Sequence, residues 1–329
     1  MISLNEFEKM HKNCLTDAQF SELPNHENGK VRDSYNLPGG QRIMISTDRQ
    51  SAFDLILAAV PFKGQVLNQT SQFWFEKTSD ICPNHVLSFP DPNVIITQNL
   101  EMLPVEIVVR DYMTGSTETS IWPMYKKGLR NLYGHKFPEN IIKNQKLPKT
   151  IITPTTKASK GEHDEPITAD EIITTNLLSK EIWEEVSEKA LALFKRGKEI
   201  ASRNDLILVD TKYEFGLDQS GTITIADEIH TPDSSRFWLK DSYERCMKNG
   251  ENPESLDKEF LRLWIKACCN PYKDQIPPIP LETLTEFSKK YIQLYEQITG
   301  QNFKAPNIDE PIRERIYKNL KTVFPKYFS

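Results

Sequence analysis

The sequence predicts a globular protein of mixed strands and helices, and three observations predict it. Its 329 residues are 38% hydrophobic and 26% charged, the composition of a soluble protein with a packed core. Pro38, Gly39 and Gly40 separate two β-prone runs, which is typical of a hairpin. Apolar residues recur with the helical period from Ser179 to Arg203. The length allows two or three domains.

The first third of the chain is expected to form strands and one long helix. Gly29 and Lys30 stand at the entrance of the hairpin. Beyond it, apolar and aromatic residues at helical spacing predict a helix over 67–82, which the following proline ends. Two short strands are expected next, at 94–97 and 105–110.

The rest of the chain is expected to alternate loops, strands and helices. The irregular segment 122–149 reads as loops over a sheet edge, whereas 153–168 lacks large apolar residues and is either a disordered or a substrate-facing loop. The long helix, with Ser179 as its N-cap, precedes a buried strand at 206–209. From residue 242 on, the chain is mostly helical.

Charge and cysteine usage exclude several classes of protein. The chain has 41 Lys and Arg against 46 Asp and Glu, and this net charge of −5 argues against binding to nucleic acid or a membrane surface. The five cysteines lack zinc-site spacing, which indicates reduced thiols. The N-terminus has no secretory pattern, and the longest apolar run, LILAAVPF, is far shorter than the ~20 residues that cross a bilayer. We therefore expect a cytoplasmic protein.

The most informative passage is the run from the buried strand through VDTKYEFGLDQSGTITIADE. Side chains alternate along a strand, so Asp210, Lys212 and Glu214 are expected on one face. A turn symmetric about residues 219 and 220 would place Asp227 opposite Lys212 on that face. Paired carboxylates suit Mg²⁺, which takes its other ligands from water and phosphate. The alternative is a solvated face of the hairpin with ordinary salt bridges.

Two further patterns suit anions. Arg236 precedes Phe237 and Trp238, and an arginine anchored by aromatics presents a rigid fork to a carboxylate or phosphate. The alternative is a surface arginine that packs over Trp238. Arg110 ends a strand shortly before a small-residue turn, where backbone N–H groups and hydroxyls can approach an anion, although such a turn is commonly structural; its residues are Thr114, Gly115 and Ser116.

Three weaker candidates complete the set. The basic turn Gly29-Lys30-Val31-Arg32 could lie over nucleotide phosphates, although it is not a P-loop. Asp48, Arg49 and Ser51 follow a strand, and capping of the next turn is the favoured interpretation of these residues. The polar loop contains Lys157, His163 and Asp164, and such a loop histidine is commonly solvated. Neither a GxSxG elbow nor a GxGxxG loop occurs.

Taken together, these motifs resemble the SAICAR synthetase family. The resemblance runs in order from Gly29 to Trp238 and rests on GKVRDSY, STDRQSAFD, KGQVLNQTSQFWF, VEIVVRDYMTGS, TPTTKASKGEHDEPI and the carboxylate hairpin that ends in SSRFW. It implies an ATP- and Mg²⁺-dependent ligase of purine biosynthesis. Such an enzyme joins CAIR, 5-amino-1-(5-phosphoribosyl)imidazole-4-carboxylate, to L-aspartate and releases SAICAR, ADP and phosphate, with an acyl phosphate as the intermediate.

The resemblance also implies an ATP-grasp-like α+β fold. We expect a β-rich nucleotide-binding lobe over 1–113, a central substrate- and metal-binding domain with an antiparallel sheet over 114–241 and a helical region over 242–329. Whether the chain is a monomer or a homo-oligomer is left open. Two other classes remain possible, a small-molecule kinase with a related ATP-binding lobe and a non-catalytic nucleotide-binding module.

The resemblance assigns roles to the candidate residues. Glu214 and Asp227 are assigned to metal binding. The residues assigned to the nucleotide are Gly29, Lys30, Val31 and Arg32, together with the backbone around Met102, Val105 and Glu106. CAIR binding and catalysis fall to Arg110, Gly115, Ser116, Lys212, Arg236 and Asp210, with Asp210 either reading the amino group of CAIR or orienting Lys212. The candidates for the aspartate site are Asp48, Arg49, Ser51, Lys157, His163 and Asp164.

Overall fold

The computed structural model describes residues 4–53, 55–118, 120–157 and 164–328. The chain forms two compact units, and each unit is assembled from separate stretches of sequence. Unit 1 consists of residues 1–75, 85–99 and 260–329, and unit 2 consists of 76–84 and 100–259. The expected division into consecutive segments, 1–113, 114–241 and 242–329, therefore differs from this one, in which the C-terminal helices complete the N-terminal unit.

Unit 1 contains a five-stranded antiparallel sheet in the order β1-β2-β3-β7-β6. Its strands are β1 (His26–Asn28), β2 (Arg32–Leu37), β3 (Gln41–Ser46), β6 (Val86–Asp91) and β7 (Val94–Gln98). The β2–β3 hairpin confirms the prediction, and Gly39 and Gly40 have positive φ values of 96° and 80° in its turn. A separate two-stranded ribbon joins β4 (Arg49–Ala52) to β5 (Leu55–Ala59).

Helices from both ends of the chain share the core of unit 1. They are α1 (Leu4–Lys12), α8 (Leu281–Thr299) and α9 (Ile312–Val323), together with parts of α2 (Lys63–Thr78) and α7 (Glu259–Cys268). Tyr35 and Ile43 of the sheet belong to one apolar cluster with Leu67 of α2, Phe287 of α8 and Ile316 of α9. Helix α2 begins and ends four residues earlier than predicted.

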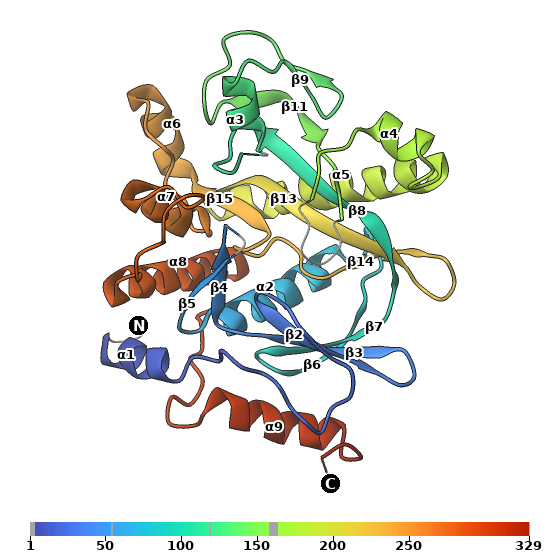
Figure 1. The fold of residues 1–329 in the computed structure, drawn as a ribbon, viewed down its shortest axis with the longest axis vertical. Coiled ribbons are helices and arrows are strands. Elements are labelled where there is room, and N and C mark those ends of the chain that lie inside the picture. Colours follow the sequence, from blue (N-terminus) through green and yellow to red (C-terminus); the bar gives the residue numbers. More distant parts are fainter. Residues whose placement is uncertain (1–3, 54, 119, 158–163, 329) are drawn as a thin grey trace. The chain divides into compact units, whose positions relative to one another are not determined.

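Unit 2 is built on a second antiparallel sheet (Figure 1) in the order β11-β8-β13-β14, with β12 also paired to β8 and β15 to β13. Its strands are β8 (Glu101–Tyr112), β11 (Lys146–Ile152), β12 (Thr155–Thr156), β13 (Leu206–Leu217), β14 (Ile223–Ala226) and β15 (Ser235–Leu239). Helix α5 (Lys180–Arg203) packs against β8 and β13. Its predicted cap is confirmed, because the Ser179 side chain accepts a hydrogen bond from the backbone N–H of Ile182.

The segment expected to be loops contains short regular elements with a core of their own. These are α3 (Ile121–Lys126), β9 (Asn131–Leu132) and β10 (His135–Lys136), followed by β11, and Ile121, Tyr125 and Leu132 are buried together. Farther along, unit 2 adds α4 (Ala169–Thr174) and α6 (Lys240–Asn249). The helical end of the chain is confirmed by α6 to α9, and none of the helices described could cross a bilayer.

The register of the second sheet gathers charge on one face. Asp210 of β13 pairs with Arg110 of β8 and with Arg236 of β15. Two residues farther along β13, Lys212 pairs with Val108, and Glu214 then pairs with Glu106. Residues paired across strands point to the same face of the sheet, so this face carries alternating cations and carboxylates.

Candidate active site

Two arginines share one buried carboxylate at one end of the charged face. Oδ2 of Asp210 accepts hydrogen bonds from Nη1 of Arg110 at 3.0 Å and from Nη1 of Arg236 at 2.5 Å. Nε of Arg110 donates to Oγ1 of Thr153 at 2.8 Å. Two guanidinium groups that share one carboxylate bring several N–H donors together, an arrangement that suits a phosphate or carboxylate ligand.

Arg236 is not the surface arginine of the alternative interpretation. Its side chain is only 12% exposed, and its Nε lies 3.7 Å from Oε2 of Glu259. Burial lowers the pKa of Arg236, but the charges of Asp210, Glu259 and Asp257 outweigh burial and raise it above its ordinary value. The surroundings therefore keep this guanidinium charged and oriented.

The small-residue turn lies next to this arginine pair. Gly115 has a φ of 116°, and a Cβ there would overlap the side chain of Ser120 and lie 3.6 Å from Nη2 of Arg236. Thr114, just before it, donates a hydrogen bond from Oγ1 to Oδ1 of Asn144 at 2.7 Å. The structure thus brings Gly115 of the predicted anion-binding turn close to the predicted arginine.

Farther along the same face, two lysines bind two facing glutamates. Nζ of Lys212 donates to Oε1 of Glu106 at 2.6 Å and also to Oε1 of Glu214. Nζ of Lys157 donates to Oε2 of Glu214 at 2.5 Å. From the sequence, Glu106 was expected only in the segment that meets adenine, and its pairing with Lys212 was missed. Alternation along VEIVVR, which puts Glu106 on the face of Arg110, was the available signal.

The lysines decide the ionisation of this cluster. Burial raises the pKa of Glu214, but Lys212 and Lys157 outweigh burial and lower that pKa to about 2. Burial, helped by the charge of Glu214, raises the pKa of Glu106 against the opposing effect of Lys212. The pKa of Lys212 is raised because Glu214, Glu106 and Asp227 together outweigh its burial. Glu214 and Lys212 are therefore both charged at neutral pH.

Asp227 lies near this cluster, but the predicted register of its hairpin is wrong by one residue. Glu214 pairs with Ala226, because the backbone N–H of Asp218 donates to the carbonyl of Thr222 at 3.1 Å and the turn is centred on a single residue. Strand β14 ends at Ala226, and Asp227 follows in the left-handed region with a φ of 59°. Its charge raises the pKa of Lys212, so the carboxylate lies near that lysine.

The donor atoms of this region fit a hard divalent cation. Among the residues that the structure describes, no group of three or more His, Cys, Asp or Glu side chains is arranged to hold a metal. Mg²⁺ commonly takes only one or two protein carboxylates and completes its octahedron with phosphate and water. Glu214, ionised and facing Glu106, and Asp227 supply oxygens of the required kind.

The segment expected to meet adenine forms a bulge in β8. Met102 pairs with Gly216 and Glu106 pairs with Glu214, so residues 103–105 lie opposite Phe215 alone. On its other side the bulge is bound by the polar loop, because the backbone N–H of Lys157 donates to the carbonyl of Pro104 at 3.0 Å.

Of the rest of the polar loop, the structure describes residues 164–168. Asp164 is exposed, and its charge helps to raise the pKa of Glu106, so it lies near the carboxylate cluster. His163, which was a candidate for the aspartate site, lies outside the described residues.

In unit 1, the basic turn links β1 to β2. The backbone N–H of Gly29 donates to the carbonyl of Arg32 at 2.9 Å, and a Cβ at residue 29 would lie 2.6 Å from that oxygen. The tight turn therefore needs a glycine at this position. Lys30 is exposed, Val31 is half-buried, and Nε of Arg32 donates to Oγ of Ser46 at 3.3 Å.

Asp48 has a structural environment, although the helical turn that it binds, at Gly64, lies 16 residues later and is not the next turn of the chain, which the capping interpretation expected. Its two carboxylate oxygens accept hydrogen bonds from the backbone N–H groups of Leu15 at 2.8 Å and of Gly64, in the first turn of α2, at 2.9 Å. The side chain is fully buried, which leaves it no surface for a substrate. Ser51 is half-buried in β4, and its carbonyl accepts from Nε2 of Gln50 at 3.0 Å.

The sequence model of the family described as SAICAR synthetase matches residues 25–279, a range that contains both the basic turn and the charged face. The chain belongs to the SAICAR synthetase family.

Curated relatives agree over nearly the whole chain. A putative phosphoribosylaminoimidazole-succinocarboxamide synthase 2 of Agrobacterium fabrum is 54% identical over 94% of this chain and 98% of its own length. The chloroplastic phosphoribosylaminoimidazole-succinocarboxamide synthase of Arabidopsis thaliana is 50% identical over 93% of this chain and 75% of its own length.

Solved structures of SAICAR synthetases have the same fold. The enzyme of Saccharomyces cerevisiae, complexed with SAICAR, superposes with a TM-score of 0.76 at 31% identity and covers 88% of this chain and 100% of its own. A SAICAR synthetase in complex with ADP gives 0.65 at 25% identity, with 85% and 100% covered.

Membership of the SAICAR synthetase family makes this chain an enzyme, a ligase of purine biosynthesis with an α+β fold. This membership rules out the two alternative classes, the small-molecule kinase and the non-catalytic nucleotide-binding module.

Proposed function

We propose that the chain joins the carboxylate of CAIR to the amine of L-aspartate and cleaves ATP to ADP and phosphate. The carboxylate of CAIR attacks the γ-phosphorus and displaces ADP, which gives an acyl phosphate. The aspartate amine then attacks the acyl carbon, loses a proton and displaces phosphate, so that the amide of SAICAR forms. The observation that carries this proposal is the single sheet face on which an arginine pair adjoins a lysine–carboxylate cluster.

The arginine pair is proposed to bind the anionic groups of CAIR. Arg110 and Arg236 each direct a guanidinium group to the same region, and Gly115 and Ser116 add a turn beside Arg236. Asp210 supports this arrangement by binding both arginines, so it orients them rather than Lys212. Its carboxylate can also accept a hydrogen bond from the amino group of CAIR.

The carboxylate cluster is proposed to hold Mg²⁺ through Glu214 and Asp227. When bound, the metal neutralises charge on the phosphates of ATP. Glu106 lies across from Glu214 and binds Lys212, which places the ammonium group beside the metal ligands. Lys212 then stabilises negative charge that develops during phosphoryl transfer, a reaction in which positioning and electrostatics supply most of the catalysis.

Nucleotide and aspartate binding complete the assignment. We assign the nucleotide phosphates to the turn Gly29–Arg32, and adenine to the β8 bulge between Met102 and Glu106, whose backbone groups diverge from β13. For L-aspartate we retain Lys157 and Asp164 of the polar loop, together with His163.

The reaction itself can be tested by following ADP release while each substrate is omitted in turn. We expect release only when ATP, CAIR and L-aspartate are all present, or a single stoichiometric burst without aspartate if the acyl phosphate accumulates. Sustained ADP release driven by a hydroxyl compound in place of CAIR and aspartate would contradict the ligase assignment.

The metal assignment predicts severe losses from small changes. Glu214→Gln and Asp227→Asn remove a negative charge while keeping the side-chain size, and we expect each to reduce kcat by about 100-fold or more, because charge neutralisation on phosphate is lost. The matched control is Glu101→Gln, at an exposed glutamate of β8, which should retain kcat within twofold. Activity of Glu214→Gln close to that of the control would refute the metal assignment.

A further inference from the structure

Arg49 uses every one of its side-chain donors inside unit 1. An arginine has five N–H groups. Here Nε donates to the carbonyl of Lys30 at 3.3 Å, Nη1 donates to the carbonyl of Thr16 at 2.8 Å and to Oδ2 of Asp33 at 3.4 Å, and Nη2 donates to the carbonyl of Gly29 at 2.9 Å and to Oδ1 of Asp33 at 2.6 Å. The side chain is 7% exposed. This environment leaves no N–H for a substrate carboxylate, contrary to the role in the aspartate site considered above.

The same contacts extend along the whole basic turn. The carbonyls of Gly29 and Lys30 accept from Arg49, and the carbonyl of Val31 accepts from both the backbone N–H (3.0 Å) and the hydroxyl (2.8 Å) of Thr47. Three successive carbonyls of the turn therefore point to the segment 47–49. This fixes the path of the backbone from which Lys30 and Arg32 project.

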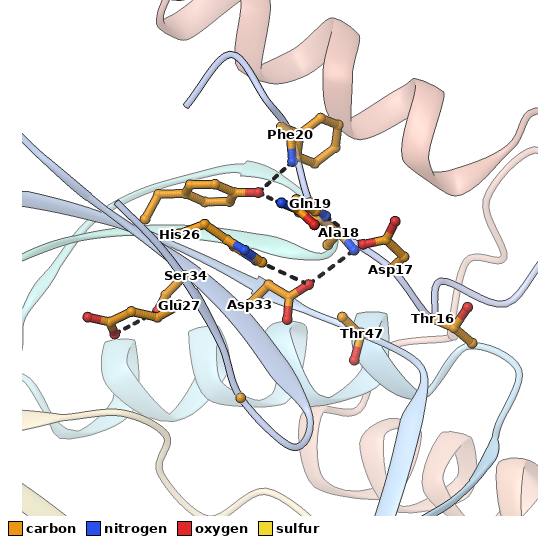
Figure 2. Close-up of polar contacts among 12 residues, drawn as sticks. Thr16, Asp17, Ala18, Gln19, Phe20, His26, Glu27, Asp33, Ser34 and Thr47 are labelled. Carbon is orange, nitrogen blue, oxygen red and sulfur yellow. Dashed lines mark hydrogen bonds and ion pairs between the residues drawn. The ribbon is translucent and has the colours of Figure 1, made fainter. Parts of the chain in front are cut away.

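Asp33 supports Arg49 from β2. Figure 2 shows its carboxylate between the ring of His26, with Nε2 at 3.8 Å, and the backbone N–H of Ala18, at 3.1 Å. The side chain of Asp33 is fully buried, so this carboxylate depends on Arg49 for its neutralisation. Because neighbouring residues of a strand face opposite ways, an inward Asp33 directs Arg32 to the other face of β2.

We propose that Arg49 is a positioning residue for the nucleotide. Through Asp33 and the carbonyls of the turn, it holds Gly29–Arg32 in the conformation in which Lys30 and Arg32 bind the phosphates. This role rests on the proposed function of the turn. Arg49 acts through these residues and touches neither ATP nor L-aspartate.

The test compares ADP binding with the KM for each substrate. Arg49→Lys keeps the charge but loses the fork that spans Asp33 and three carbonyls, so we expect the Kd for ADP, measured by calorimetry, to rise about tenfold. The KM for ATP should rise in parallel, while the KM for L-aspartate changes less than twofold. Thr47→Val removes one hydroxyl contact at Val31 and gives a second, milder variant, with an expected two- to threefold rise in Kd.

Arg315→Lys is the matched control for loss of a buried arginine fork. In the same unit, Arg315 binds the fully buried Asp91 through Nε at 2.9 Å and Nη2 at 3.1 Å. Arg315→Lys should lower the free energy of unfolding, as Arg49→Lys does, but should leave the Kd for ADP unchanged. An equal rise in Kd in this control, or a rise in the KM for aspartate that exceeds the rise for ATP in Arg49→Lys, would overturn the proposal.

Lys30→Ala separates the positioning role from the function of the turn. If Lys30→Ala binds ADP as tightly as the unaltered protein, the turn is not the phosphate site and the positioning role fails with it. If Lys30→Ala weakens ADP binding while Arg49→Lys and Thr47→Val do not, only the positioning role is refuted.

Discussion

Two carboxylates, Asp48 and Asp257, lie in places where burial opposes ionisation. Burial raises the pKa of Asp48 to about 6 and that of Asp257 to about 7. Each nevertheless accepts two backbone hydrogen bonds, Asp48 from Leu15 and Gly64 and Asp257 from Phe237 and Glu259. These residues stabilise local structure without needing a negative charge at acidic pH.

Asp48 should therefore make the stability of the protein depend on pH. Its pKa is about 6 in the folded state and about 4 in the unfolded chain, so the folded state binds more protons between these values. The stabilising contribution of Asp48 to the free energy of unfolding is fully present below about pH 4 and is lost as the pH rises through 6.

Between pH 4.5 and pH 7, titration of Asp48 should lower the free energy of unfolding of the unaltered protein by about 2 kcal/mol. Asp48→Asn cannot titrate there, so we expect its free energy of unfolding to lack this decrease. Urea unfolding of both proteins at the two pH values measures this difference. Asp257 contributes equally to both proteins, so an unchanged pH dependence in Asp48→Asn would contradict the shifted pKa of Asp48.

At the scale of elements, the sequence predicts what depends on local pattern. Alternation correctly placed Asp210, Lys212 and Glu214 on one face, since the period of a strand does not depend on its neighbours. The position of Asp227 could not be predicted, because it depends on the turn at Asp218, whose side chain accepts from two backbone N–H groups and lengthens the turn by one residue. The contacts of Arg49 were equally hidden, because they join residues far apart in sequence.

The short strands β1, β9, β10 and β12 were also missed. Each has two or three residues, too few for a period to appear, and each depends on a partner strand for its extended conformation. The core of the segment around α3 comes from residues such as Tyr125 and Ile141, which prolines and lysines separate along the chain. Its local polarity gave the impression of a loop.

Helix α5 provides a test in which the usual sign of a substitution reverses. Gly→Ala inside a helix ordinarily stabilises it by about 1 kcal/mol. At Gly197, however, a Cβ would overlap the ring of His230 and lie 2.7 Å from Cδ2 of Leu208. His230 also bonds the hydroxyl of Tyr213, the residue between Lys212 and Glu214.

We expect Gly197→Ala to lower the free energy of unfolding by about 1–3 kcal/mol, because the buried contact is overpacked. Urea unfolding measures the loss, and kcat should fall as the Tyr213 contact shifts. Glu188→Ala, at an exposed position of the same helix, is the control and should stay within about 0.5 kcal/mol. A stabilised Gly197→Ala would show that His230 yields without cost.

At the scale of the whole molecule, net charge and local charge answer different questions. The net charge of −5 argued against a surface for polyanions, yet on the charged face of unit 2 two buried arginines bind Asp210. Composition does not reveal these buried cations, to which we assign the binding of small anions. The division into units was equally invisible, since periodicity reports neighbours in sequence and unit 1 joins both ends of the chain.

Asp91 of β6 links the sheet of unit 1 to α9 near the C-terminus. Its carboxylate accepts two bonds from Arg315 and one from Nδ2 of Asn319 at 2.7 Å, both residues of α9. Asp91→Asn leaves Arg315 without its buried carboxylate, so we expect the free energy of unfolding to fall by about 3–5 kcal/mol.

Urea unfolding of Asp91→Asn, together with the rate of proteolysis within residues 312–323, measures this loss. Lys318→Ala breaks an exposed pair with Glu310 near the same helix and should cost less than about 1 kcal/mol. Equal stability of the two variants would show that α9 does not depend on the Asp91 contact.

The discontinuous make-up of unit 1 has a consequence for synthesis on the ribosome. Unit 2 ends at Glu259, so all of its chain is translated before α8 and α9. The sheet of unit 1 emerges first. Its apolar residues, such as Tyr35 and Ile43, stay exposed until Phe287 and Ile316 have been translated and can pack against them. The strands of unit 1 are therefore made early, but this unit is the last to be completed. Until α8 and α9 are translated, these strands stay soluble only if they aggregate slowly or if a chaperone binds them.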